Sequence, residues 1–296
     1  MERGVSSLAI IREGETLLFD CGEGTQRQMM RYGITFALTD IFFTHTHGDH
    51  ILGLTGLLRT LQLQGHSEPM RIWAPAGAAR TLRQCISLGG ERLAFPVNVT
   101  ELAQGHAIDR GDYEIRTFGV DHRGEASLGY ALVEKDRLGR FDPEKARSMG
   151  IPEGPLWGRI HKGERITLDD GRIVDPSELV GERRRGRRIV LSGDTRPCES
   201  VLEAARDADL LIHEATFAND EAARAVETGH STAREAAQVA LAAGARRLAL
   251  THISARYSRD AQELEREARM VFPRTTIARD GMEIELPLTE EVSARE

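Results

Sequence analysis

The chain has 296 residues, enough for one large α/β domain or two of ordinary size, and its 40% apolar content can build a sizeable core. The formal net charge of −7 does not indicate a nucleic-acid partner for the chain as a whole. No apolar run approaches a membrane span, no signal-peptide layout opens the chain, and three scattered cysteines favour reduced thiols in a cytoplasm over disulfides.

Short apolar runs alternate with amphipathic stretches along most of the sequence. The expected strands, in chain order, are 6–11, 16–19, 41–43, 71–74, 97–102, 113–120, 127–133, 189–191, 210–213 and 248–251, with two closing strands around Ile277 and Ile284. The expected helices are 25–32, a segment with its apolar face at Leu52 to Leu61, 76–87, a helix opened by the capping box Thr232-Ala233-Arg234-Glu235 and closed near Gly244, and 260–271. This alternation predicts an α/β layered fold with helices outside the sheets.

The stretch His45-Thr46-His47-Gly48-Asp49-His50 directly follows the apolar run Ile41-Phe42-Phe43. At the end of a buried strand, this spacing lets His45 and His47 reach one metal ion while Asp49 and His50 turn toward a second. Imidazole and carboxylate ligands suit Zn²⁺, with Mn²⁺ or Fe as poorer alternatives. The alternative is a surface loop that happens to be rich in histidine.

Three later residues complete the prediction of a two-metal site. His122 follows the expected strand 113–120, Asp194 lies in Ser-Gly-Asp-Thr after a strand, and His252 lies in Leu-Thr-His-Ile after another. A shared ligand is needed, and Asp194 is the best candidate because a carboxylate has two oxygens. Two ions would acidify a shared water and neutralise charge at a phosphoryl centre.

The segment Glu134–Arg188 departs from the alternation. It holds 14 lysines and arginines and 11 acidic residues, a net charge of +3, so the rest of the chain carries −10. The densest positive cluster is Arg183-Arg184-Arg185-Gly186-Arg187-Arg188. A solvated loop is one interpretation, but the length, the prolines, Trp157 and the basic bias favour a functional appendage.

The order HxHxDH, His, SGDT, His resembles the metallo-β-lactamase superfamily, and within it the chain is similar to the ribonuclease Z family of tRNA 3′-processing endonucleases. Four features carry the narrower resemblance: Phe19-Asp20-Cys21-Gly22-Glu23-Gly24-Thr25-Gln26, His213-Glu214-Ala215-Thr216, Gly229-His230-Ser231-Thr232, and the insertion containing Gly154-Pro155. The resemblance implies a single four-layer αββα sandwich with an inserted flexible arm at 134–188. It also implies two Zn²⁺ per subunit, precursor tRNA as substrate and a homodimer.

The resemblance also assigns roles to residues. It implies that one zinc is held by His45, His47 and His122, the other by Asp49, His50 and His252, and that Asp194 bridges them. Asp49 would also orient or deprotonate the water, and Glu214 with His230 would pass a proton to the departing 3′ oxygen. The alternative for His230 is a helix-start residue bonded to the backbone. In the arm, Gly154-Pro155 and Lys162-Gly163 are expected to contact the RNA backbone.

The start of the chain departs from the family pattern. Family members usually open with a strand and a loop ending in Arg-Asn-Val-Ser-Ser, whereas here Arg3, Val5, Ser6 and Ser7 fit the loop's end and Gly4 replaces Asn. The first strand is therefore expected to be absent. Two rival functions are another hydrolase on this scaffold, such as a cyclic-nucleotide phosphodiesterase, arylsulfatase or lactonase, and a non-catalytic RNA-binding protein. The long basic arm argues against the first and the complete ligand set against the second.

Overall fold

The computed structural model describes residues 3–88, 90 and 92–288. The described chain divides into two compact units, one formed by residues 3–132 together with Arg188–Leu286, and one formed by Val133–Arg187. Within the described residues, no helix combines the length and apolar content needed to cross a bilayer.

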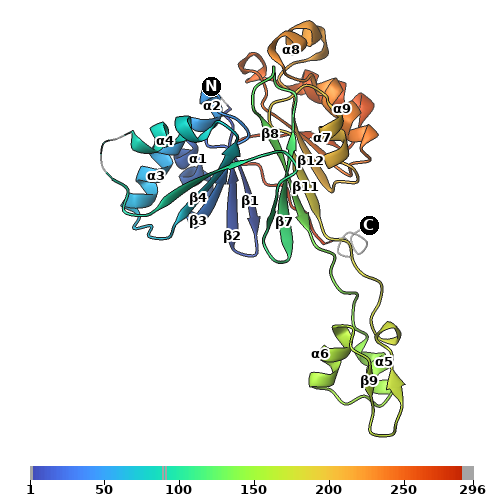
Figure 1. Ribbon diagram of the computed structural model, residues 1–296. Helices are drawn as coiled ribbons and strands as arrows, with labels where there is room; N and C mark the ends of the chain where they lie inside the picture. The colour runs from blue at the N-terminus through green and yellow to red at the C-terminus, as the bar shows by residue number, and fades with distance from the viewer. Residues whose placement is uncertain (1–2, 89, 91, 289–296) are drawn as a thin grey trace. The chain divides into compact units, whose positions relative to one another are not determined.

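Two sheets pack face to face in the first unit (Figure 1). One has the strand order β1 (Leu8–Arg12), β2 (Glu15–Phe19), β3 (Leu38–Phe42), β4 (Met70–Pro75), β5 (Val97–Leu102). The other has the order β14 (Thr275–Ile277), β13 (Leu248–Thr251), β12 (Leu210–Glu214), β11 (Arg188–Leu191), β8 (Leu128–Glu134), β7 (Tyr113–Gly119), β6 (Ala107–Asp109). The strands β2 to β5 and β11 to β14 run parallel within their sheets, so their carboxyl ends meet at common edges.

The core between the sheets is aromatic and aliphatic. Phe42 on β3 contacts Tyr130 on β8 with ring centroids 5.5 Å apart, and both side chains are fully buried. Leu17, Leu128 and Ile212 belong to the same apolar cluster, which therefore joins strands of both sheets. Burial of such side chains is the main driving force that holds the two sheets together.

Helices cover the outer faces of both sheets and complete four layers (Figure 1). The first sheet is covered by α1 (Thr25–Tyr32), α3 (Leu54–Leu63) and α4 (Ala79–Ser87), and α2 (Gly48–Ile51) is a single turn before α3. The second sheet carries α7 (Glu199–Ala204), α9 (Ala233–Ala242) and α10 (Gln262–Val271), and α8 (Ala222–Thr228) lies in the connection between β12 and α9. The expected αββα sandwich is therefore confirmed.

Most expected elements are confirmed, with small differences at the ends. The capping box at Thr232 and Glu235 opens α9, and Gly244 lies just past its end with a left-handed φ of 66°. The prediction of a strand around Ile284 is wrong. Ile284 and Leu286 lie outside any strand and pack against the core between the sheets, so their alternation reflects burial rather than strand pairing.

The second unit has regular structure and a hydrophobic core of its own. Its elements are α5 (Pro143–Ser148), α6 (Pro155–His161), β9 (Ile166–Thr167), β10 (Ile173–Val174) and the 3₁₀ turn Pro176–Glu178. Ile151, Ile160 and Leu179 are buried in this core, and Trp157 packs on it. Its core shares no residue with the clusters of the first unit, so the segment packs as a small module.

Candidate metal centre

The metal-ligating side chains expected from sequence all follow strands of the first unit. His45 and His47 lie between β3 and α2, and Asp49 and His50 lie within α2. His122, Asp194 and His252 follow β7, β11 and β13 respectively. The structure brings these seven residues, drawn from four separate parts of the chain, into one cluster.

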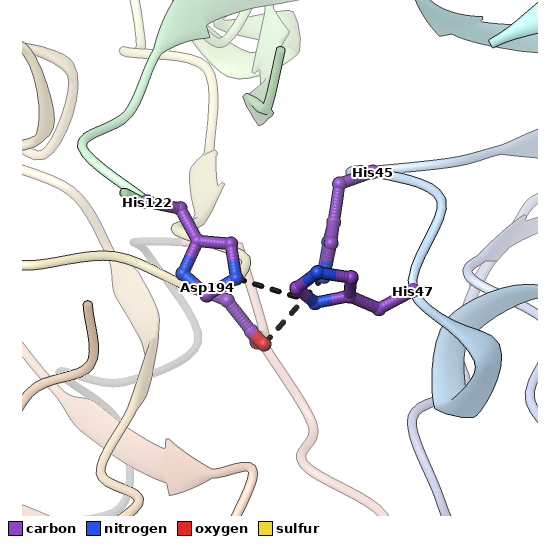
Figure 2. Close-up of side chains that lie close together, drawn as sticks. All are labelled: His45, His47, His122 and Asp194. Atoms are coloured by element: carbon purple, nitrogen blue, oxygen red, sulfur yellow. Dashed lines mark hydrogen bonds and ion pairs between the residues drawn. The ribbon is translucent and has the colours of Figure 1, made fainter. Parts of the chain in front are cut away.

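One half of the cluster contains His45, His47, His122 and Asp194, whose ligand atoms all lie within 4.8 Å of one another. Figure 2 shows the three imidazoles and the carboxylate turned toward a common point. His122 Nε2 lies 3.3 Å from His47 Nδ1, and His45 Nε2 lies 3.7 Å from Asp194 Oδ2. Ligands on a tetrahedral zinc ion stand about 3.3–3.4 Å apart, so these spacings suit that ion.

The other half contains Asp49, His50 and His252, again within 4.8 Å of one another. Asp194 Oδ2 lies 3.4 Å from His50 Nε2 and 3.3 Å from His252 Nε2, besides its approach to His45. Asp194 therefore stands between the two halves, which is where a shared carboxylate ligand must lie.

Two buried nitrogens support the fit to metal ions. The Nε2 atoms of His45 and His50 are buried and make no hydrogen bond within the described chain. Buried polar atoms are ordinarily satisfied, so each such atom needs a partner. A cation placed between these nitrogens and Asp194 would supply it, and an imidazole and carboxylate donor set suits Zn²⁺.

The electrostatics of the cluster also favour cations. Burial, reinforced by the neighbouring His50, lowers the pKa of His45 to about 3, so this imidazole is neutral and able to ligate. The hydrogen bond from His252 lowers the pKa of Asp49, and its carboxylate is ionised at neutral pH. Although burial opposes protonation, the charge of Asp194 raises the pKa of His252 to about 9. A metal ion would displace that proton, so binding is expected to release protons.

Each imidazole is held by a partner at its other ring nitrogen. His122 Nδ1 donates to the carbonyl of Gly229 at 2.9 Å. The remaining pairs are His45 Nδ1 with Thr44 Oγ1 at 3.0 Å, His47 Nε2 with Glu125 Oε2 at 2.9 Å, His50 Nδ1 with Asp20 Oδ2 at 2.8 Å and His252 Nδ1 with Thr216 Oγ1 at 2.9 Å. These contacts fix which nitrogen faces the cluster.

Sequence reasoning gave no role to Asp20, Glu125 or Thr216. Asp20 directly follows β2, which pairs in parallel with β3, so its position after that strand was a usable signal. Glu125 and Thr216 lie in irregular loops, where no periodicity indicates the direction of a side chain.

Next to the candidate metal ligands, His230 and Glu214 form a hydrogen-bonded pair. His230 Nδ1 lies 2.8 Å from Glu214 Oε1, and the His230 ring stacks on His252 with centroids 5.2 Å apart. Glu214 is fully buried and also accepts from the backbone of Thr195 and from Thr216. The carboxylate fixes the imidazole at the border of the metal cluster, an arrangement suited to proton transfer.

The other residues singled out by sequence belong to none of these ligand groups. Gly154 and Pro155 stand at the start of α6 and Lys162 and Gly163 at its end, all in the second unit. His213 is buried and donates from Nδ1 to the carbonyl of Glu214 at 2.7 Å, so it joins no ligand group.

Comparisons with family models and with curated proteins agree on one family. A family model described as beta-lactamase superfamily domain matches residues 161–253, and one described as anti-Pycsar protein Apyc1 matches residues 5–139. The chain is 70% identical to a ribonuclease Z of Gemmatimonas aurantiaca, over 99% of this chain and 94% of that protein. It is 53% identical to a ribonuclease Z of Myxococcus xanthus, over 98% of this chain and 94% of the other.

Solved structures agree with these sequence matches. The short form of human tRNase Z is 30% identical, with a TM-score of 0.69 over 97% of this chain and 94% of the human chain. A metallo-β-lactamase fold protein of Bacillus subtilis, 20% identical with a TM-score of 0.65 over 94% of this chain and 90% of its own, shares the fold.

Proposed function

Because the chain belongs to the ribonuclease Z family of the metallo-β-lactamase superfamily, we propose that it is a metal-dependent endoribonuclease acting on precursor tRNA. It removes the 3′ trailer by hydrolysis of a phosphodiester and leaves a 3′-hydroxyl on the tRNA. The observation that carries this proposal is the complete set of seven ligand side chains with the His230–Glu214 pair beside them.

The proposed cofactor is two Zn²⁺ per subunit, with Mn²⁺ or Fe as alternatives. One ion is assigned to His45, His47 and His122 and the other to Asp49, His50 and His252, with Asp194 shared. When bound, the two ions acidify a water and neutralise charge at the phosphoryl centre.

Asp49 is proposed to orient and deprotonate the attacking water. Its carboxylate is ionised and half-exposed, with Oδ2 3.3 Å from His252 Nε2 and 3.7 Å from His50 Nε2. The side chain is therefore fixed by the two histidines while one face stays open to solvent, which a group that accepts a proton from water requires.

His230 is proposed to donate a proton to the departing 3′ oxygen. Hydrolysis expels an alkoxide, a poor leaving group, so a proton donor lowers the barrier for that step. Glu214 occupies Nδ1 of His230, so Nε2 is the atom from which the proton leaves. The buried carboxylate would stabilise the charged imidazole before transfer.

The second unit is proposed to bind tRNA, as an arm with contacts at Gly154, Pro155, Lys162 and Gly163. Double-stranded RNA is recognised through shape and backbone contacts, which suits basic side chains such as that of Lys162. The family resemblance further supports a cytoplasmic homodimer as the active form.

The test is metal analysis combined with cleavage of a 3′-extended tRNA. The purified protein should contain two equivalents of zinc and release one trailer, leaving a 3′-hydroxyl that a ligase or polymerase can extend. Mature tRNA and cyclic nucleotides are the comparison substrates. Hydrolysis of cyclic nucleotides with no cleavage of the extended tRNA would replace this proposal with a small-molecule phosphodiesterase.

A further inference from the structure

Arg196 lies immediately beyond the Ser-Gly-Asp-Thr motif and connects three parts of the site. Its backbone N–H donates to the carbonyl of Asp121 at 2.7 Å, and Asp121 N–H donates to Thr195 Oγ1 at 3.1 Å. This short antiparallel bridge holds the loop of the proposed ligand His122 against the loop of Asp194.

The guanidinium of Arg196 reaches the residue proposed as proton donor. Nη1 donates to the backbone carbonyl of His230 at 2.5 Å. The following residue is also held, because Ser231 Oγ donates to the carbonyl of Thr195 at 2.6 Å. Hydrogen bonds at two successive residues, His230 and Ser231, therefore hold this backbone against the segment Thr195-Arg196.

Glu235 fixes the direction of that guanidinium. Nη1 donates to Glu235 Oε2 at 2.9 Å and Nη2 pairs with Oε1, so the contact is bidentate. The same carboxylate accepts from Thr232 N–H at 2.8 Å and completes the capping box of α9. Both side chains are largely buried, at 18% and 24% exposed, where a bidentate pair has a well-defined geometry.

From these contacts we infer that Arg196 and Glu235 are positioning residues for His230, anchoring its backbone to the start of α9 while Glu214 orients its ring. This inference rests on the proposed role of His230 as proton donor. Neither residue touches the reacting atoms. A backbone shift of about 1 Å at His230 would displace its ring from the leaving oxygen, and a misplacement of that size can reduce the rate of cleavage by around a hundredfold.

The test compares Arg196→Met, Arg196→Lys and Glu235→Gln under single-turnover conditions. Arg196→Met should slow cleavage of 3′-extended tRNA at least tenfold with tRNA affinity and zinc content unchanged. Arg196→Lys should restore part of the rate, because an ammonium can still donate to the carbonyl. Glu235→Gln keeps the capping box, since Gln also serves at that position, and should show a smaller loss in the same step.

Two readouts separate positioning from a general structural role. Hydrolysis of bis(p-nitrophenyl) phosphate, whose leaving group needs no proton, should be unaffected by Arg196→Met. In a His230→Ala background, Arg196→Met should cause no further loss. Arg246→Met is the matched control, because Arg246 also forms an ion pair, but with Asp209 at 3.4 Å and not with Glu235.

Three results would overturn the inference: an equal loss of rate in Arg196→Met on extended tRNA and on bis(p-nitrophenyl) phosphate, a loss of zinc in Arg196→Met, or a double variant in which the losses of Arg196→Met and His230→Ala multiply. So would an unchanged rate in Arg196→Met while His230→Ala is slow. If His230→Ala itself cleaves the extended tRNA normally, the proton-donor assignment fails and the inference fails with it. The two failures are therefore distinguishable.

Discussion

His50 Nδ1 and Asp20 Oδ2 lie 2.8 Å apart although the residues are 30 positions apart in the chain. Both side chains are buried, and Asp20 also accepts from the backbone N–H of Thr44 at 2.8 Å. The contact turns Nε2 of His50 toward Asp194. Asp20 has an unusual backbone with a φ of 56°, so the chain is strained to place this carboxylate.

Asp20→Asn is therefore expected to weaken metal binding without removing a ligand. Loss of a partner of this kind typically lowers metal affinity 10–100-fold, because the imidazole is no longer held and polarised. Zinc affinity is measured by competition with a chromophoric chelator, with Asp209→Asn, a carboxylate outside the proposed ligand set, as the control. An unchanged affinity in Asp20→Asn would show that the contact does not tune the metal site.

His47→Ala is expected to remove one metal ion and abolish cleavage while leaving tRNA affinity nearly intact. His47 is a proposed ligand, whereas the proposed tRNA contacts lie in the second unit. Metal content is measured on the purified variant and tRNA binding by a filter or anisotropy assay, with His106→Ala as control. Substantial cleavage by metal-depleted His47→Ala protein would refute the ligand assignment.

His230→Ala should lower the rate of tRNA cleavage by about 10²–10⁴-fold, the usual range for a lost general acid. Glu214→Gln should act in the same step, so the double variant should be little slower than His230→Ala. Bis(p-nitrophenyl) phosphate should be hydrolysed at nearly the parent rate by all three. Losses that multiply in the double variant would mean that the two side chains act independently.

Replacement of Leu138 to Arg185 by a short Gly-Ser linker should sharply weaken precursor binding and cleavage. The deleted residues form most of a unit with its own core, so the sandwich should remain folded and should still hydrolyse a small phosphodiester. Phosphate contacts release counterions, so the salt dependence of tRNA binding should become shallower. Equal loss of both activities would show that the segment is structural, and unchanged tRNA cleavage would show that it has no role in binding.

The buried carboxylate of Asp40 on β3, which belongs to no candidate ligand group, makes the free energy of unfolding depend on pH. Its carboxylate is buried and contacts Arg71, Arg110 and Trp73 at 2.6–2.7 Å. Although burial opposes ionisation, hydrogen bonds from Arg71 and the other two side chains lower the pKa of Asp40 to about 2. An unfolded Asp has a pKa of about 3.9. The stabilisation is thus complete above that value and is lost as pH falls toward 2.

The free energy of unfolding should therefore fall by about 1–2 kcal/mol more in the parent than in Asp40→Asn between pH 5 and pH 2. Urea denaturation in the presence of a chelator measures this difference without a contribution from metal loss. Parallel pH dependences in the two proteins would contradict the assignment.

The layers of the fold and the meeting of the candidate ligand side chains could be predicted from the sequence, because both depend on strand positions. Side chains directly after apolar runs, such as Asp194 and His252, were expected to meet at the ends of parallel strands, and they do. The contact of Glu125 with His47 depends on a loop conformation that no short-range pattern encodes. Strand β6 was missed because three residues are too few for an alternation to be recognised.

The inserted segment leaves the sandwich after β8 and re-enters at β11, and these strands are neighbours in the second sheet. The insertion thus occupies the position of a hairpin turn, where length changes cost little because loop-closure entropy grows only slowly with length. At its base, Arg187 Nε donates to Glu134 Oε2 at 2.8 Å, so the two connecting strands are already tied together. A module in this position can change in length without altering the strands of the sandwich, so its proposed contacts with RNA can change independently of the metal cluster.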